Sequence, residues 1–203
     1  MVDKDLNTEQ RIFEAAKDVF VRKGLEGARM QEIADEANIN KALLHYYFRG
    51  KDKLFEAVFR ETFFKLLPNL VDLMKSDISL FEKIRLFVEN YIDIINDNPL
   101  LPIFVLHELN RNPQRVVEMI KSSGINPVYF VIQIQEEIEK GTIELINPLH
   151  LIVNMISMCI FPFVARPILQ GIIFNEDSQN YDAFIQERKK EVSDFIINSI
   201  RKK

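Results

Sequence analysis

The chain has 203 residues, enough for one large domain or for a small domain joined to a larger one. Apolar residues make up 47% of it, which allows a sizeable core, while a net charge of -4 excludes a molecule-wide basic field that would hold nucleic acid. The single cysteine, Cys159, cannot form an internal disulfide, and the polar residues 1–5 carry no signal peptide, so we expect a cytoplasmic protein.

The first helix is predicted from apolar residues that recur at helical spacing and form one buried face. Gly24 is expected to end it as a C-terminal cap. A second, short helix is predicted over 30–37, followed by a turn at Asn38 and Ile39. The inward residues of these two helices are Ile12, Ala15, Ala16, Val19, Phe20, Ile33, Ala34 and Ala37.

The segment 38–48 has the features of a helix that reads DNA. Asn40 is a good N-cap, and Leu44, Tyr47 and Phe48 share one face at helical spacing. The outward face then combines a cation, small and apolar groups, an imidazole and a phenol. Such a face fits the major groove, which offers phosphates, base acceptors and thymine methyl groups. The outward residues are Lys41, Ala42, Leu43, His45 and Tyr46.

The fourth helix is predicted to begin near Lys51 with Leu54, Phe55, Val58 and Phe59 inward. Pro68 should kink or end it. A cation in the first turn of a helix opposes the helix dipole, so we interpret Lys51 as a ligand for a backbone phosphate. The alternative is a solvated lysine that Asp52 partly balances.

The second half of the chain is predicted to be helical throughout. Asn followed by Pro is a compact helix-start signal, because Asn caps the free amides and Pro fits the first helical position. Four such pairs, with Ser79 as a further cap, predict helices over 79–97, 99–111, 113–122, 127–140 and 148–166. A broken segment over 167–174 follows, and then a last helix over 182–201 with an apolar stripe of Val192, Phe195, Ile196 and Ile200.

Residues 145–165 contain no Asp, Glu, Lys or Arg and approach the length of a membrane span. They also contain Asn147, Pro148, His150, Asn154, Ser157 and Pro162. We therefore expect a helix that is buried in the core or in an interface, and no membrane partner.

The first 55 residues resemble the DNA-binding domain of the tetracycline-repressor-like (TetR) family of bacterial transcriptional regulators. The order and spacing of the matching residues are those of the family motif over about a quarter of the chain. They are Thr8, Glu9, Ile12, Ala15, Ala16, Phe20, Gly24, Ile33, Ala34, Ala37, Ile39, Leu44, Tyr47, Phe48, Lys51 and Leu54. The segment 137–148 also resembles a common lead-in to the family's dimer helices.

The resemblance implies an all-α fold, with a DNA-binding domain over 1–52 made of three helices with a helix-turn-helix, and a larger helical domain over 53–203 for effector binding and dimerisation. It implies DNA contacts at Arg29, Gln31, Asn40, Lys41, Ala42, Leu43, His45, Tyr46, Tyr47 and Lys51. Arg29 and His45 depart from the usual Thr and Tyr of the family, and Asn38 replaces a common Gly. Gln31 suits an adenine edge but is equally explained as a solvated helix residue.

A ligand cavity in the larger domain is also implied by the resemblance, and the sequence supplies only candidates. These are polar residues within apolar helical stretches, a pattern typical of small-molecule sites: Tyr91, His107, Glu108, Tyr129, Gln133 and Asn154. Each is explained as well by a satisfied core or surface group. No Cys/His spacing indicates a metal site, no cofactor is expected, and Cys159 fits a small buried hydrophobe.

The leading functional hypothesis is a ligand-responsive transcriptional regulator, most often a repressor in this family. It would bind a palindromic DNA operator as a homodimer, through the apolar helix at 147–166 and the last helix, and a small-molecule effector would release it. The alternative is a DNA-binding regulator or architectural protein without an effector. No nucleophile–base pair or phosphate-binding glycine loop indicates an enzyme.

Overall fold

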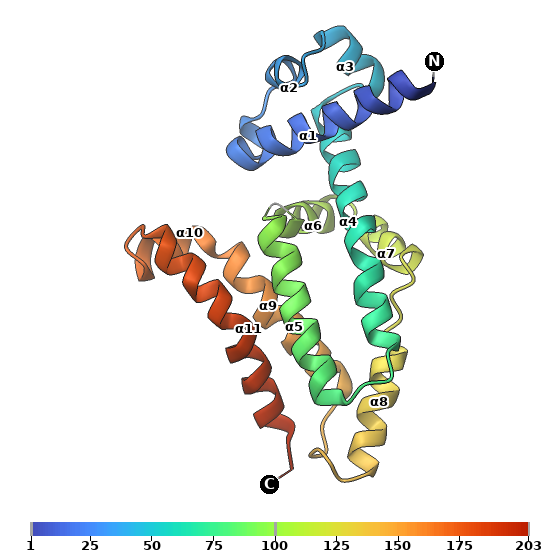
Figure 1. Ribbon diagram of the computed structural model, residues 1–203, viewed down its shortest axis with the longest axis vertical. Helices are drawn as coiled ribbons and strands as arrows, with labels where there is room; N and C mark the ends of the chain where they lie inside the picture. The colour runs from blue at the N-terminus through green and yellow to red at the C-terminus, as the bar shows by residue number, and fades with distance from the viewer. Residues whose placement is uncertain (1, 100, 203) are drawn as a thin grey trace. The chain divides into compact units, whose positions relative to one another are not determined.

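The computed structural model describes the backbone of residues 2–99 and 101–202 and the side chains of residues 8–61, 68–99 and 101–202. Within these ranges every regular element is a helix, and one isolated antiparallel bridge joins Ile143 to Arg201. The predicted all-α fold class is confirmed. The chain divides into two compact units, 1–65 and 66–203 (Figure 1). The predicted functional boundary after residue 52 stays a prediction.

The N-terminal unit contains α1 (Val2–Gly27), α2 (Met30–Glu36), α3 (Lys41–Phe48) and the first part of α4 (Lys51–Lys75). At Gly24 the backbone leaves helical geometry with a φ of 67°, which confirms the predicted end of the regular first helix. Apolar positions at helical spacing fill the core as expected, among them Ile12, Phe20, Ile33, Leu44 and Leu54. Burial of this shared face is what holds such short helices together.

Pro68 was predicted to kink or end the fourth helix. It does not end the helix, because α4 continues through it to Lys75, and the kink stays a prediction. Proline removes one amide donor, but its fixed φ is compatible with a helix. The hydrogen bonds on either side therefore suffice to carry α4 from the N-terminal unit into the C-terminal unit.

The C-terminal unit consists of the remainder of α4 followed by a helical bundle. Its elements are α5 (Leu80–Asp97), α6 (Leu101–Arg111), α7 (Pro113–Ser122), α8 (Val128–Glu139), α9 (Pro148–Val164), α10 (Arg166–Ile168), the π-helix η1 (Leu169–Ile173) and α11 (Ser178–Ile200). Three predicted caps are present, because the side chains of Ser79, Asn112 and Asn147 each accept a hydrogen bond from an amide in the first turn.

Two helix starts were predicted wrongly. Asn98 does not begin a helix: its side chain donates to the carbonyl of Ile94 at 2.9 Å and closes the end of α5, and α6 begins at Leu101. The last helix begins at Ser178, four residues earlier than expected, because the carboxylate of Asp177 accepts hydrogen bonds from two amides of its first turn.

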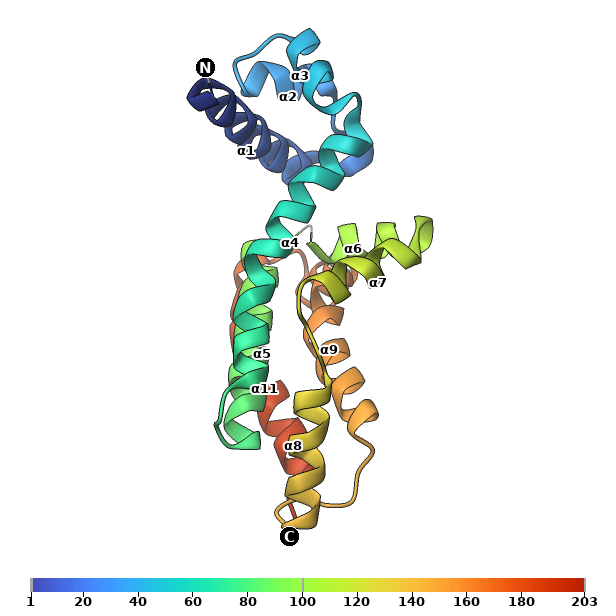
Figure 2. The same cartoon turned by 90° about the vertical axis from the view of Figure 1, so that its right-hand side faces the viewer.

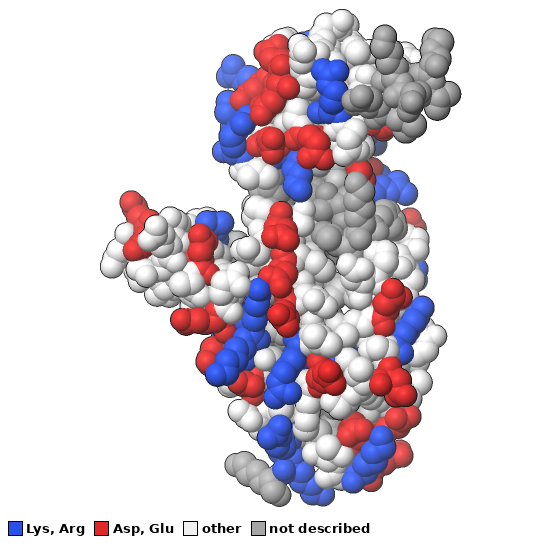
Figure 3. Space-filling model, viewed as in Figure 1, with Lys and Arg blue, Asp and Glu red and all other residues white. Residues whose placement is uncertain are grey.

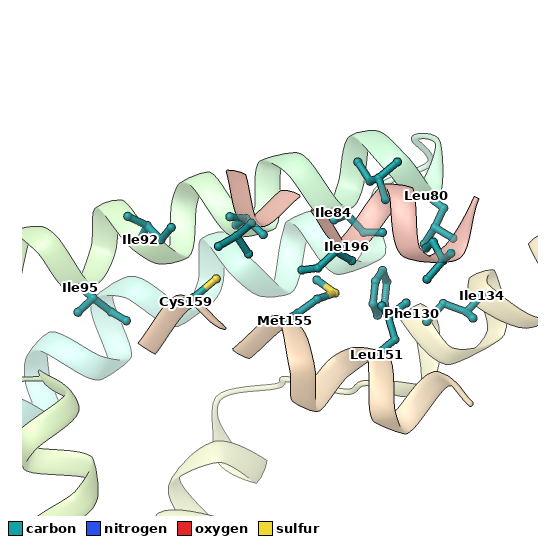
Figure 4. Packing of buried hydrophobic residues seen from close by; sticks show 14 of the residues in the cluster. Leu80, Ile84, Ile92, Ile95, Phe130, Ile134, Leu151, Met155, Cys159 and Ile196 are labelled. Carbon is teal, nitrogen blue, oxygen red and sulfur yellow. The ribbon is translucent and has the colours of Figure 1, made fainter. Parts of the chain in front are cut away.

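The core of the C-terminal unit lies where α5, α9 and α11 pack together (Figure 2). Figure 4 shows Met155 and Cys159 of α9 directed toward the buried face of α5. Val192, Ile196 and Ile200 of α11 are buried as predicted. Phe195 is not: its side chain is 62% exposed, because the buried stripe of α11 continues through Ile197 instead.

The C-terminal end of α4 is fastened to the bundle by polar contacts. Lys83, on α5, is almost fully buried and donates from Nζ to the carbonyl oxygen of Met74 at 3.0 Å. Burial lowers the pKa of Lys83, and the charge of Asp77 acts in the opposite direction. Gln133 of α8 donates from Nε2 to the carbonyl of Ile78 at 2.7 Å. The connection between α4 and α5 is therefore held from two helices.

A search of the described residues for bilayer-spanning helices finds no single helix that is long and apolar enough. Helix α9 together with the segment 166–173 meets the length and composition criteria only as a pair bent by 58°.

Candidate nucleic-acid interface

Helix α3 presents its outward face to solvent as the sequence predicts. The side chain of Asn40 accepts from the amide of Leu43 at 2.7 Å and caps the first turn. Leu44 and Phe48 are buried, whereas Tyr46 is 79% exposed. Other outward positions, Lys41, Ala42 and His45, are also exposed, and Leu43 and Tyr47 are half-buried. Lys41, Ala42, His45 and Tyr46 are thus exposed on one side of the helix, whereas Asn40 and Tyr47 also take part in its packing and capping.

The turn between α2 and α3 is fixed by backbone geometry and by α1. Asn38 adopts a left-handed conformation with a φ of 52°, which Asn tolerates better than most residues. The guanidinium of Arg11, on α1, donates from Nη2 to the carbonyl of Ala37 and to that of Asn38 at 3.1 Å. Arg11 therefore holds the turn that sets the direction of α3. Sequence reasoning missed this residue, because nothing in the spacing of α1 marks it.

Aromatic packing fixes the inward side of α3. Phe48 contacts Phe13 of α1 with ring centroids 5.6 Å apart, and Tyr47 stacks on Phe48 at 6.2 Å. Ion pairs on the surface join α1 to α2, with Lys23 Nζ 2.7 Å from a carboxylate oxygen of Glu32. The unit thereby holds α3 against α1 and α2 (Figure 1).

Lys51 has a partner that the sequence did not indicate. Its Nζ donates to the carbonyl oxygen of Glu26, near the end of α1, at 3.2 Å. This contact offsets part of the cost of a cation at the start of α4. An ammonium group has three donors, so the contact with Glu26 leaves donors for a phosphate. The phosphate role of Lys51 stays a prediction.

The two predicted contact residues around α2 are exposed. Arg29 precedes α2 in an extended conformation, and Gln31 lies in its first turn. The amide nitrogen of Gln31 donates to Asp35 at 2.7 Å, so its side chain is already ordered along the helix. Reading a base edge would require Gln31 to give up or share that bond with Asp35.

Residues 12–58 match the family model described as bacterial regulatory proteins of the tetR family. The matched segment covers α2, α3 and their turn, where the geometry above is found. Residues 12–58 are a DNA-binding segment of the TetR family. The N-terminal unit is accordingly a DNA-binding helix-turn-helix, and the chain is a transcriptional regulator.

Similar TetR proteins and structures agree with that assignment. The chain is 26% identical over 180 residues to the probable HTH-type transcriptional regulator YttP of Bacillus subtilis, covering 87% of this chain and 86% of YttP. It is 49% identical over 51 residues to the HTH-type transcriptional repressor SCO4008 of Streptomyces coelicolor, covering 25% and 27% of the two chains. The crystal structure of the hemolysin II transcriptional regulator HlyIIR aligns with a TM-score of 0.61 and 26% identity, covering 97% of this chain and 98% of that one.

The C-terminal candidates of this chain do not form one cluster. Glu108 is buried on α6, with carboxylate oxygens 3.5 Å from Nδ1 of His107 and 4.0 Å from Nη1 of Arg115. Tyr91 packs against the α5–α9–α11 core and stacks on Phe87 with ring centroids 5.4 Å apart. These two places contain the most enclosed of the predicted ligand groups.

The other three candidates lie elsewhere. Tyr129 is 49% exposed, with the ammonium of Lys75 6.0 Å from its ring centroid. Gln133 holds the connection that follows α4, as described above, and Asn154 is exposed on α9. A search of the described residues for groups of three or more His, Cys, Asp or Glu side chains that could hold a metal ion finds none.

Proposed function

We propose that this regulator is a ligand-responsive repressor that binds a palindromic operator as a homodimer and is released by a small-molecule effector. The exposed outward face of α3 is the observation that supports operator recognition best. Tyr46 and its exposed neighbours contribute little to the core, which Leu44 and Phe48 fill. Side chains in this position are available for base edges and phosphates.

The proposed homodimer is supported by apolar side chains that α9 leaves in solvent. Leu149, Val153 and Phe161 are each about 60% exposed, and Phe195 of α11 is similarly exposed. Exposed apolar surface of this extent is typical of an interaction site. Two copies of α9 and α11 related by a two-fold axis would cover it in a four-helix interface. Such symmetry would place two α3 helices on half-sites about 34–36 Å apart or at a multiple of that spacing.

The proposed effector response is supported by the continuity of α4. This helix begins at Lys51 in the N-terminal unit and ends at Lys75 in the C-terminal unit, where Lys83 fastens it. A ligand that favours a position of α4 unsuited to DNA binding would release the operator. By reciprocity, the operator must weaken ligand binding by the same factor.

Repression is proposed because SCO4008, to which the N-terminal segment is 49% identical, is named a repressor. A reporter gene placed behind the operator tests the sign: expression should fall when this chain is produced and recover when the effector is added. Higher expression in the presence of the chain would make it an activator.

The operator itself is the test of the DNA-binding proposal. Selection of bound duplexes from a random library, followed by footprinting, should yield a palindrome protected on both half-sites. Sedimentation of the same protein should give a dimer at micromolar concentration. A protected site without two-fold symmetry, together with a stable monomer, would contradict the proposal. A purified operator complex that no compound dissociates would favour a regulator without an effector.

A further inference from the structure

Arg188, on α11, is half-buried, and its guanidinium has no counter-ion among the side chains that the structure describes. Its Nη2 donates to the carbonyl oxygen of Met158 on α9 at 3.0 Å, and the group lies 5.8 Å from the ring centroid of Phe184. Its Nε is buried and has no hydrogen-bond acceptor among the described residues. Among the described residues, no carboxylate oxygen lies within 4.0 Å of a guanidinium nitrogen of Arg188.

The neighbouring cations differ from Arg188 in this respect. Lys189 Nζ lies 2.5 Å from a carboxylate oxygen of Asp93, and Arg85 Nη2 lies 3.8 Å from Asp194. These pairs link α5 to α11 at the surface, where Figure 3 shows basic and acidic side chains close together. Asp93 and Asp194 thus pair with Lys189 and Arg85 and not with Arg188. Buried charges are normally paired, because an unpaired one loses its hydration without compensation.

The surroundings of Arg188 supply donors and apolar surface. The thiol of Cys159 on α9 belongs to the α5–α9–α11 core, and the phenol of Tyr91 on α5 packs against it. The charge of Arg188 acts to lower the pKa of Cys159. Burial raises the pKa of Cys159 to about 12 despite Arg188, and burial raises the pKa of Tyr91 to about 12. Both groups are thus uncharged at neutral pH, and neither supplies the missing anion.

We propose that Arg188 anchors the carboxylate of a small organic acid whose apolar part packs against the α5–α9–α11 core. A guanidinium matches a carboxylate with two parallel hydrogen bonds, and the orphan Nε is one of the donors that this geometry uses. A single cation in apolar surroundings suits a monoanion better than a phosphate dianion, which would keep an unbalanced charge. This inference rests on the proposed function and specifies the chemistry of its effector.

Thermal denaturation of the full chain with butanoate, hexanoate and octanoate tests the inference. Each acid is compared with the amine and the alcohol of the same chain length, which keep the apolar part and change only the head group. At about a hundredfold excess over Kd, a bound acid should raise Tm by roughly 5–10 °C. Amines and alcohols should give no comparable rise, and equal shifts from all three head groups would overturn the proposal.

Matched variants locate the site. Arg188→Gln should abolish the shift caused by the acid, and Arg188→Lys, which keeps the charge but not the fork, should reduce it. Arg201→Gln is the control, because Arg201 also lies over an aromatic ring, that of Phe81 at 5.0 Å, and should respond like the wild type. In the wild type the Nε–H NMR signal of Arg188 should move on titration with the acid, a readout that needs no variant. A static signal would overturn the assignment.

Two further outcomes separate this inference from the proposed function. If Arg188→Gln turns the dimer into a monomer while the acid still binds, the guanidinium meets a carboxylate of a second copy, and the inference is wrong. If the acid binds through Arg188 but leaves operator affinity unchanged, the site is real and the effector role fails. If a neutral compound releases the operator and no acid binds, the proposed function stands without this site.

Discussion

Removing the Asn40 cap of α3 should weaken DNA binding, whereas removing the equivalent Asn112 cap of α7 should not. In Asn40→Ala the amide of Leu43 loses its acceptor at 2.7 Å, and in Asn112→Ala the amide of Arg115 loses one at 3.3 Å. Each loss should cost about 1 kcal/mol of stability and lower Tm by roughly 2–4 °C. Helix α3 has eight residues and depends on its cap, because helices this short are marginal alone.

If α3 must be ordered to bind, the operator Kd rises as the ordered fraction of α3 falls, and a loss of about 1 kcal/mol in Asn40→Ala sets an upper limit of about fivefold on that rise. Any phosphate contact of Asn40 itself would add to that effect. Asn112→Ala, on α7, should bind the operator like the wild type. Fluorescence anisotropy with the selected operator gives the affinities, and calorimetry gives Tm. Equal operator affinities for the two variants, at equal loss of stability, would refute the reasoning.

Three further outcomes are expected. Lys51→Ala should lower the slope of log affinity against log salt by about 0.9, whereas Lys41→Ala should lose about 1–3 kcal/mol of discrimination against random DNA; an unchanged slope would remove the phosphate role. Tyr181→Phe should lower the free energy of unfolding by about 1 kcal/mol, because a buried hydroxyl donor is lost, and the exposed Tyr46→Phe should not change it in calorimetry. Burial lowers the pKa of Lys83, so the unfolded chain binds the Lys83 proton more tightly than the folded one. The free energy of unfolding of the wild type, measured in urea, should therefore rise relative to that of Lys83→Met as pH increases toward 10.5. Parallel curves of this free energy against pH would contradict the expectation.

Features that depend on neighbours along the chain were predicted well. The caps at Asn40, Asn112 and Asn147 were found because an Asn side chain reaches an amide two or three residues ahead. The inward faces of α1 to α4 followed from helical spacing alone. The failure at Asn98 has a local cause as well, since an Asn between two helices can close the first or open the second. Sequence does not rank those two options.

Contacts between distant segments were not predictable from spacing. Arg11 reaches carbonyls 26 and 27 residues away, and Lys51 reaches one 25 residues away. The pairing of Asp93 with Lys189 and of Asp194 with Arg85 depends on how α5 packs against α11, and spacing along the chain does not show it. The ligand candidates were chosen as polar residues in apolar stretches, a criterion that does not distinguish exposed Asn154 from enclosed Tyr91.

The support of α3 by its cap, its inward face and Arg11 has a consequence for how such a regulator diversifies. Because Ala42, His45 and Tyr46 are exposed, substitutions at these positions change the surface offered to DNA while leaving the core intact. The DNA sequence that such a helix prefers can therefore change without loss of the fold. For the same reason, a library randomised at these positions is a practical starting point for regulators directed at new promoters.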